Sequence, residues 1–189
     1  MRADESPMET PDTELVLRTL RGDREAFSGL VTRHGPVIYR VAYRILGRRA
    51  AAEDVVQETF TRAFGGLSRY RGEHGDSSFR SWLCRIAVNL ALSAARRETL
   101  LEEPVVAGTA DGTQPAEEAC LRRDVQEAMG RLPPHLRATL GLRVYGDLSY
   151  LEMAETLNCP VGTVMSRLAA ARKAMRSYLA DWLEDRTRE

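Results

Sequence analysis

The sequence predicts an all-α protein made of two small helical domains. Apolar residues recur at steps of three and four along most of the chain, capping residues precede these segments, and no strand pattern is evident. An acidic stretch with Pro and Gly, 98–116, separates the helical segments and is predicted to be a flexible linker. The domains therefore span 12–97 and 117–182, with a disordered tail at 1–11 and a charged tail at 183–189.

The first domain begins with two helices joined by a short turn. Residues 12–20 form a short helix that ends near Gly22, and Asp23 can cap the helix that follows. This second helix should break or kink at Gly35-Pro36, because proline lacks the N–H that a helix interior needs. Gly47 is the expected stop.

Residues 50–64 form the next predicted helix, which has an apolar face and an acidic face. The inward residues are Val56, Phe60 and Ala63, followed by Leu67. The outward residues are Asp54, Gln57, Glu58 and Thr61. Two interpretations of the outward face stay open, a solvated acidic surface and a docking surface for a basic partner.

A polar loop over 68–78 leads into a helix that starts at Phe79. Its buried stripe is Phe79, Leu83, Ile86 and Leu90, and the adjoining face carries Trp82, Arg85, Asn89, Ser93 and Arg96. An aromatic ring, cations and an amide on one face suit single-stranded DNA, through base stacking, phosphate neutralisation and readout of a base edge. The alternative is that Trp82 anchors the core and the arginines are solvated.

The second domain is predicted to start with a helix over 116–132. Another helix starts at Pro133-Pro134, with Leu136, Leu140 and Val144 on one face. Gly146-Asp147 closes this helix, and the C-terminal segment follows directly.

Residues 149–178 follow the pattern of a DNA-binding helix-turn-helix. Ser149 and Glu152 make a capping box, and Asn158 can take the left-handed conformation that ends a helix before Pro160 starts the next. The buried stripe of the second helix is Val161, Val164, Leu168, Ala171, Met175 and Leu179. The opposite face carries Met165, Ser166, Ala169, Arg172, Lys173 and Arg176, with Arg167 at its edge. Such a helix fits the major groove, and the alternative is a helical hairpin with a solvated basic face.

The formal net charge of zero conceals a segregated charge pattern. Residues 62–97 hold seven Arg and two acids, 98–119 hold six acids and no Lys or Arg, and 160–178 hold four cations and no acid. Two basic segments on either side of an acidic one indicate contacts with a polyanion at two places.

Other classes of protein find little support in the sequence. Cys84, Cys120 and Cys159 are widely spaced, no Cys or His pattern has zinc-ligand spacing, and reduced thiols in a cytosolic protein are expected. No phosphate-binding loop or nucleophile elbow is present, so we expect neither an enzyme nor a cofactor nor a metal site. No signal peptide or membrane-spanning segment is predicted.

Three segments together resemble the extracytoplasmic-function (ECF) sigma factors, the small two-domain branch of the bacterial sigma-70 family. They are DVVQETF at 54–60, FRSWLCRIAVN at 79–89 and LSYLEMAETLNCPVGTV at 148–164. The resemblance covers roughly 12–180. It implies a sigma-2 domain over 12–97 and a sigma-4 domain over 117–182, with the acidic linker threaded through RNA polymerase.

The resemblance also implies partners and roles for particular residues. Core RNA polymerase would bind Asp54, Gln57, Glu58 and Thr61. The −10 promoter element would be bound by Tyr70, Arg71, Phe79, Arg80, Trp82, Arg85, Asn89, Arg96 and Arg97. The −35 element would be bound by Thr163, Met165, Ser166, Arg167, Ala169, Ala170, Arg172 and Lys173. An anti-sigma factor is a further expected partner, since members of the family are commonly held inactive by one.

The sequence departs from the family pattern on the face that would read the −35 element. Many relatives have Lys or Arg where Met165 stands, and a bulky or basic pair where Ala169-Ala170 stands. We therefore expect affinity to depend on Arg167, Arg172 and Lys173, and base readout on Ser166, apolar contacts and DNA shape.

A competing hypothesis is an autonomous helix-turn-helix transcription regulator that binds duplex DNA without polymerase. It would explain 149–178 and would predict tight binding of the free protein to duplex DNA, as a dimer on a palindrome. It would leave the loop and the Trp82–Asn89 face without a role.

Overall fold

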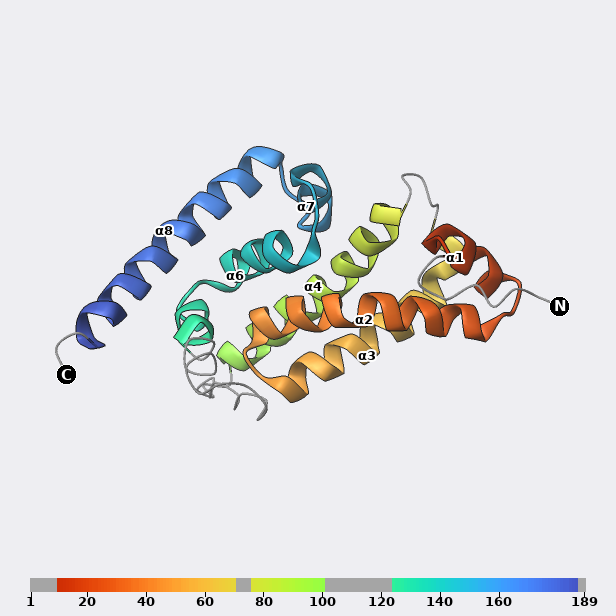
Figure 1. Cartoon of the computed structure of the whole chain (residues 1–189), viewed down its shortest axis with the longest axis horizontal. Helices are drawn as coiled ribbons and strands as arrows, with labels where there is room; N and C mark the ends of the chain where they lie inside the picture. Colours follow the sequence, from red (N-terminus) through yellow and green to blue (C-terminus); the bar gives the residue numbers. More distant parts are fainter. Residues whose placement is uncertain (1–9, 71–75, 101–123, 187–189) are drawn as a thin grey trace.

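The computed structural model describes residues 10–70, 76–100 and 124–186, and every regular element in these ranges is helical (Figure 1). The first lobe contains α1 (Asp12–Leu20), α2 (Arg24–Leu46), α3 (Arg49–Gly66), the 3₁₀ turn η1 (Leu67–Arg69) and α4 (Asp76–Leu100). The second lobe contains a helix at 124–130, α6 (Pro134–Gly141), the π-helical turn η2 (Leu142–Gly146), α7 (Tyr150–Thr156) and α8 (Val161–Arg186). The predicted all-α class is confirmed; the linker lies largely outside the described residues.

Helix ends in the first lobe follow the predicted local signals. Asp23 caps α2, its carboxylate accepting hydrogen bonds from the backbone N–H groups of Glu25 (3.0 Å) and Ala26 (3.1 Å). Gly47 ends α2 in the left-handed conformation, with φ 73°. The break considered at Pro36 does not occur, and α2 continues through it. Buried Leu30 and Ile38 on either side of Pro36 hold α2 in the core, which offsets the lost hydrogen bond.

The N-terminal helix α1 is fastened to α2 by a buried carboxylate. Asp12 is 2% exposed, and it accepts hydrogen bonds from Arg33 (2.5 Å) and from Nε2 of His34 (2.6 Å). Arg33 also donates to the backbone carbonyl of Thr10 at 2.6 Å. Burial alone would raise the pKa of Asp12, but the hydrogen bonds and charges of His34 and Arg33 outweigh it and hold the pKa below its ordinary value of 3.8.

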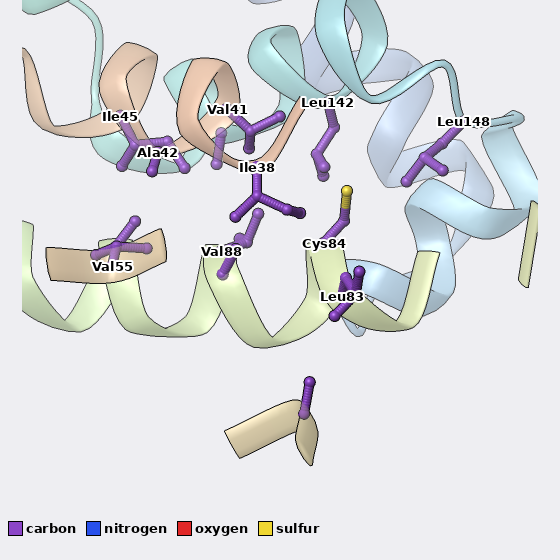
Figure 2. Close-up of a cluster of buried hydrophobic side chains, with 14 of the residues drawn as sticks. Ile38, Val41, Ala42, Ile45, Val55, Leu83, Cys84, Val88, Leu142 and Leu148 are labelled. Carbon is purple, nitrogen blue, oxygen red and sulfur yellow. The ribbon is translucent and has the colours of Figure 1, made fainter. Parts of the chain in front are cut away.

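The two lobes share one hydrophobic core. Ile38 and Val41 of α2 and Leu83 and Cys84 of α4 pack with Leu142 and Leu148 of the second lobe, and all six are fully buried or nearly so. Figure 2 shows the Cys84 sulfur directed toward Leu142, between Ile38 and Leu148. The sequence had left the placement of the domains open, because contacts of this kind leave no local pattern.

Polar contacts surround this shared core. The hydroxyls of Ser81 on α4 and Thr156 on α7 lie 3.3 Å apart in a buried position. Arg44 of α2 donates a hydrogen bond to the side-chain carbonyl of Gln126 at 2.8 Å. The Arg44 guanidinium also lies 5.2 Å from the ring centre of Tyr145. The lobes are therefore joined by both apolar and polar contacts.

One apolar face of the second lobe was predicted incorrectly. Val144 was expected beside Leu136 and Leu140, but its side chain is 59% exposed. The chain widens into a π-helical turn at η2, where hydrogen bonds skip one more residue than in an α-helix. This extra residue rotates Val144 outward and buries Leu142 instead.

Candidate nucleic-acid interface

An aromatic cluster forms where Tyr70, which follows η1, packs against the first turns of α4. The ring centres of Tyr70 and Phe79 are 5.2 Å apart, and Trp82 lies 5.3 Å from Tyr70 and 5.7 Å from Phe79. Phe79 is only 1% exposed and also contacts the ring of His34 edge-on at 5.5 Å. Tyr70 and Trp82 are half-buried, so Phe79 supports the two rings that can reach a ligand.

The sequence left Trp82 either as a core anchor or as a ring accessible to DNA, and the burial of Trp82 is intermediate. Gly66 lies close to the six-membered ring of the Trp82 indole, and a Cβ on Gly66 would meet Cζ2 of that ring at 3.6 Å. One side of the indole is thus packed against α3, while part of the side chain remains accessible. A ring fixed in this way can stack on a base with little loss of side-chain entropy.

The basic residues predicted on α4 differ in accessibility. Arg85, Asn89, Arg96 and Arg97 are exposed, and they continue along α4 from Trp82. Arg80 is half-buried, and its guanidinium lies 3.3 Å from the carboxylate of Asp147 in the second lobe. Within the described part of the chain, Nε of Arg80 has no hydrogen-bond partner. The predicted residue Arg71 lies outside the described residues.

The acidic face of α3 is exposed. Asp54, Gln57, Glu58 and Thr61 are all exposed, as predicted. Glu58 accepts a hydrogen bond from Arg62 at 2.6 Å, and the hydroxyl of Thr61 donates to the carbonyl of Gln57. Asp54 is the other carboxylate of this face. Its sequence neighbour Glu53 forms an ion pair with Arg49 at 2.9 Å. The face therefore presents exposed carboxylates from one helix.

The helix-turn-helix forms through the predicted local contacts. The hydroxyl of Ser149 accepts from the N–H of Glu152 at 3.3 Å, and the Glu152 carboxylate accepts from the N–H of Ser149 at 2.8 Å, which completes the capping box. Asn158 adopts the left-handed conformation with φ 47° between α7 and α8. Val164, Leu168 and Ala171 are buried and fix the rotation of α8.

The outer face of α8 presents few hydrogen-bond donors in its first turns. Met165, Ser166, Ala169 and Ala170 are exposed, and Arg172, Lys173 and Arg176 follow. Thr163 is half-buried, and its carbonyl accepts from the Ser166 hydroxyl at 3.0 Å. Arg167 is half-buried and leans toward the sulfur of Cys159 at 3.6 Å, so it is set apart from the exposed cations.

Contacts between the lobes are what sequence reasoning missed. The partners of Arg80 and Ser81, which are Asp147 and Thr156, lie 67 and 75 residues further along the chain. From the sequence Asp147 marked only the end of a helix, where the structure gives it a left-handed φ of 53°, and no local pattern links it to Arg80.

Membrane and metal sites find no support among the described residues. No helix there has the length and apolar composition of a membrane span. Nor do three or more His, Cys, Asp or Glu side chains gather there as metal ligands would.

In comparison with known proteins, two family models match two separate segments of the chain. The family model described as Sigma-70 region 2 matches residues 30–100, and the model described as Sigma-70, region 4 matches residues 122–175. The RNA polymerase sigma-H factor of Pseudomonas aeruginosa is 35% identical, over 92% of this chain and 96% of that protein. The ECF RNA polymerase sigma factor SigW of Bacillus subtilis is 32% identical, over 92% of this chain and 100% of SigW.

Two solved structures share the fold. CnrH, solved in complex with the cytosolic domain of CnrY, has a TM-score of 0.70 at 25% identity, over 90% of this chain and 97% of CnrH. The sigma factor RpoE of Bartonella quintana, solved in complex with the anti-sigma factor NepR, has a TM-score of 0.67 at 22% identity, over 82% of this chain and 96% of RpoE.

Proposed function

The chain belongs to the sigma-70 family, as an RNA polymerase sigma factor of the ECF type, and we propose that three of its surfaces divide the work of promoter recognition. A sigma factor binds core RNA polymerase and directs it to promoters. We infer that the protein has no catalytic chemistry of its own and acts in the cytoplasm, where polymerase and chromosome are. The single observation that carries the division is that three different helices present different accessible side chains: α4 has half-buried Trp82 beside exposed Arg85 and Asn89, α3 has exposed acids, and α8 has exposed cations.

The first lobe, residues 12–97, binds the −10 element as unpaired DNA. The half-buried rings of Tyr70 and Trp82 provide stacking surfaces, and the amide of Asn89 can pair with a base edge. Exposed Arg85, Arg96 and Arg97 neutralise phosphates along α4, together with Arg71 and Arg80. The tight packing of Phe79 holds the two rings in place.

The second lobe, residues 117–182, binds the −35 element as duplex DNA. The exposed face of α8 enters the major groove, where Thr163, Met165, Ser166, Ala169 and Ala170 approach the bases. Arg172 and Lys173 bind phosphates at the far end of this face. Arg167 contributes less than the sequence predicts, because its side chain leans toward Cys159.

The acidic face of α3 docks on a basic surface of core polymerase. Asp54 and Glu58, with Gln57 and Thr61, supply the contacts. Opposite charge on the two partners speeds their encounter and fixes orientation.

An anti-sigma factor is the expected regulatory partner. The proposal rests on the family, and a co-transcribed neighbouring gene whose product binds this chain would support it.

The proposed function is tested with purified core polymerase and a matched pair of charge reversals on α3. Asp54→Lys is expected to weaken holoenzyme formation about tenfold, because it puts a cation against a basic surface. The adjacent Glu53→Lys, on an exposed residue paired with Arg49 and outside the docking face, should have little effect. Fluorescence anisotropy of the labelled sigma factor measures the affinity of each variant for core polymerase. Failure of the wild-type protein to bind core polymerase at any salt concentration would refute the function, and equal losses in the two variants would refute the assignment of the face.

Arg172→Ala is expected to weaken holoenzyme binding to all promoter sequences by a similar factor. The slope of log K against log salt concentration is negative, and losing one phosphate contact should reduce its magnitude by about one unit. Filter binding or anisotropy between 50 and about 200 mM salt measures the slope. Arg24→Ala, on an exposed residue of α2 outside the three surfaces, is the control and should leave the slope unchanged. A loss limited to particular sequences would show that Arg172 reads bases instead.

A further inference from the structure

The first turns of α8 lack the side chains that usually read guanine and adenine. From Gly162 to Ala170 the exposed positions are Gly162, Met165, Ser166, Ala169 and Ala170. Guanine is read by paired donors from Arg or Lys, and adenine by the amide of Asn or Gln. None of these stands among the exposed residues of this stretch, and the Ser166 hydroxyl donates a hydrogen bond to the backbone carbonyl of Thr163.

Met165 is the one large apolar side chain on this face of α8 in the described part of the chain. It is 54% exposed, while the other large apolar residues of the first turns, Val164 and Leu168, are at most 2% exposed. Small residues flank it, Gly162 one turn before and Ala169 one turn after. Small flanking side chains let the helix backbone come close to the floor of a groove, which brings the Met165 thioether and methyl group to the base edges.

The major groove presents one apolar group, the 5-methyl of thymine. Apolar side chains recognise thymine through this methyl group, while every other base edge there presents donors or acceptors. A flexible, polarisable Met side chain can adapt to the position of a methyl group.

We propose that Met165 is a specificity-determining residue that reads a thymine of the −35 element through its 5-methyl group. The inference rests on the proposed function of α8 as the −35 reading helix. The cations Arg172 and Lys173 bind the neighbouring phosphates and set the register, and Met165 supplies sequence information at one or two base pairs.

The experiment removes the methyl group and nothing else. The holoenzyme first selects its upstream element from a pool of promoter fragments randomised in that element. Each thymine of the selected element, on either strand, is then replaced by deoxyuridine, which keeps all hydrogen-bonding groups and lacks the methyl. Competition binding gives the affinity of wild-type and Met165→Ala holoenzyme for each fragment.

The wild-type holoenzyme is expected to bind about fourfold more weakly when one particular thymine becomes uracil, the value for burying a single methyl group. Met165→Ala should bind the thymine and uracil fragments equally, and Met165→Leu should restore the difference. Val144→Ala, which removes an apolar side chain 59% exposed on η2 of the same lobe, is the matched control and should keep the full difference. Met165 is exposed, so its replacement leaves the core of the lobe intact.

Three results would overturn the inference. A selected element whose thymines all tolerate uracil in the wild type would exclude methyl readout. A methyl effect that persists unchanged in Met165→Ala would assign the readout to another residue. A holoenzyme that forms but selects no upstream element would refute both the inference and the proposed −35 function of α8, whereas the first two results leave the proposed function standing.

Discussion

Phe79→Ala is expected to lower the free energy of unfolding by about 3–5 kcal/mol and to abolish most binding of the −10 strand. The ring of Phe79 is 1% exposed and has aromatic neighbours on three sides, Tyr70, Trp82 and His34. Truncation leaves a cavity that the surrounding rings can fill only by moving. Tyr70 and Trp82 would then lose the fixed positions that make them stacking surfaces.

Urea unfolding followed by far-ultraviolet circular dichroism measures the stability, and a fluorescent single strand with the −10 sequence measures binding by the holoenzyme. Phe60→Ala is the matched control, since Phe60 is 7% exposed and packs on Phe27 outside the Tyr70–Trp82 cluster. It should cost a comparable amount of stability and leave strand binding intact. Equal loss of strand binding in the two variants, at a temperature where both are folded, would show that the cluster has no specific role.

Asp12→Ala is expected to destabilise the protein by about 3–5 kcal/mol, the usual cost of removing one partner from a buried charged pair. His34, with a side chain 2% exposed, would lose its carboxylate partner, and Arg33 would lose the contact that ties α1 to α2. Urea unfolding at pH 7 measures the loss. Asp23→Ala removes a partly exposed cap carboxylate from the neighbouring turn and should cost clearly less. Equal losses would mean that the buried network contributes no more to stability than a surface helix cap.

The same carboxylate gives stability a defined pH dependence. The pKa of Asp12 is lower in the folded protein than its ordinary value of 3.8, so the unfolded chain takes up the proton first as the pH falls. The contribution of Asp12 is therefore fully present above about pH 5 and is lost as the pH falls through the folded pKa, below 3.8. Urea unfolding between pH 3 and about 7 should show a steeper acid loss in the wild type than in Asp12→Asn.

Features that depend on neighbouring residues could be predicted from the sequence. The Ser149–Glu152 capping box, the Asp23 cap and the left-handed Asn158 each depend on backbone groups within a few residues. Periodicity also predicted the buried stripe of α8 at Val164, Leu168 and Ala171, because side chains at these spacings share a helix face.

Features that depend on distant residues could not be predicted. The π-helical turn at η2 exposes Val144 and buries Leu142, and it forms where the second lobe meets α2 and α4. The pairing of Arg80 with Asp147, and the turn of Arg167 toward Cys159, follow from how elements pack in space. Among the candidate site residues, the sequence could therefore predict which helix face each occupies but not which side chains are already engaged by protein groups.

The chemical modification rate of the buried Cys84 thiol can report how often the two lobes separate. Burial raises the pKa of this thiol to about 12, and its sulfur faces Leu142 across the junction (Figure 2). At neutral pH nearly all molecules hold the protonated, unreactive thiol. An alkylating reagent can therefore modify Cys84 at an appreciable rate only after the second lobe has separated from the first. In a chain whose Cys120 and Cys159 are replaced by Ser, the modification rate would follow that opening directly, before and after polymerase is added.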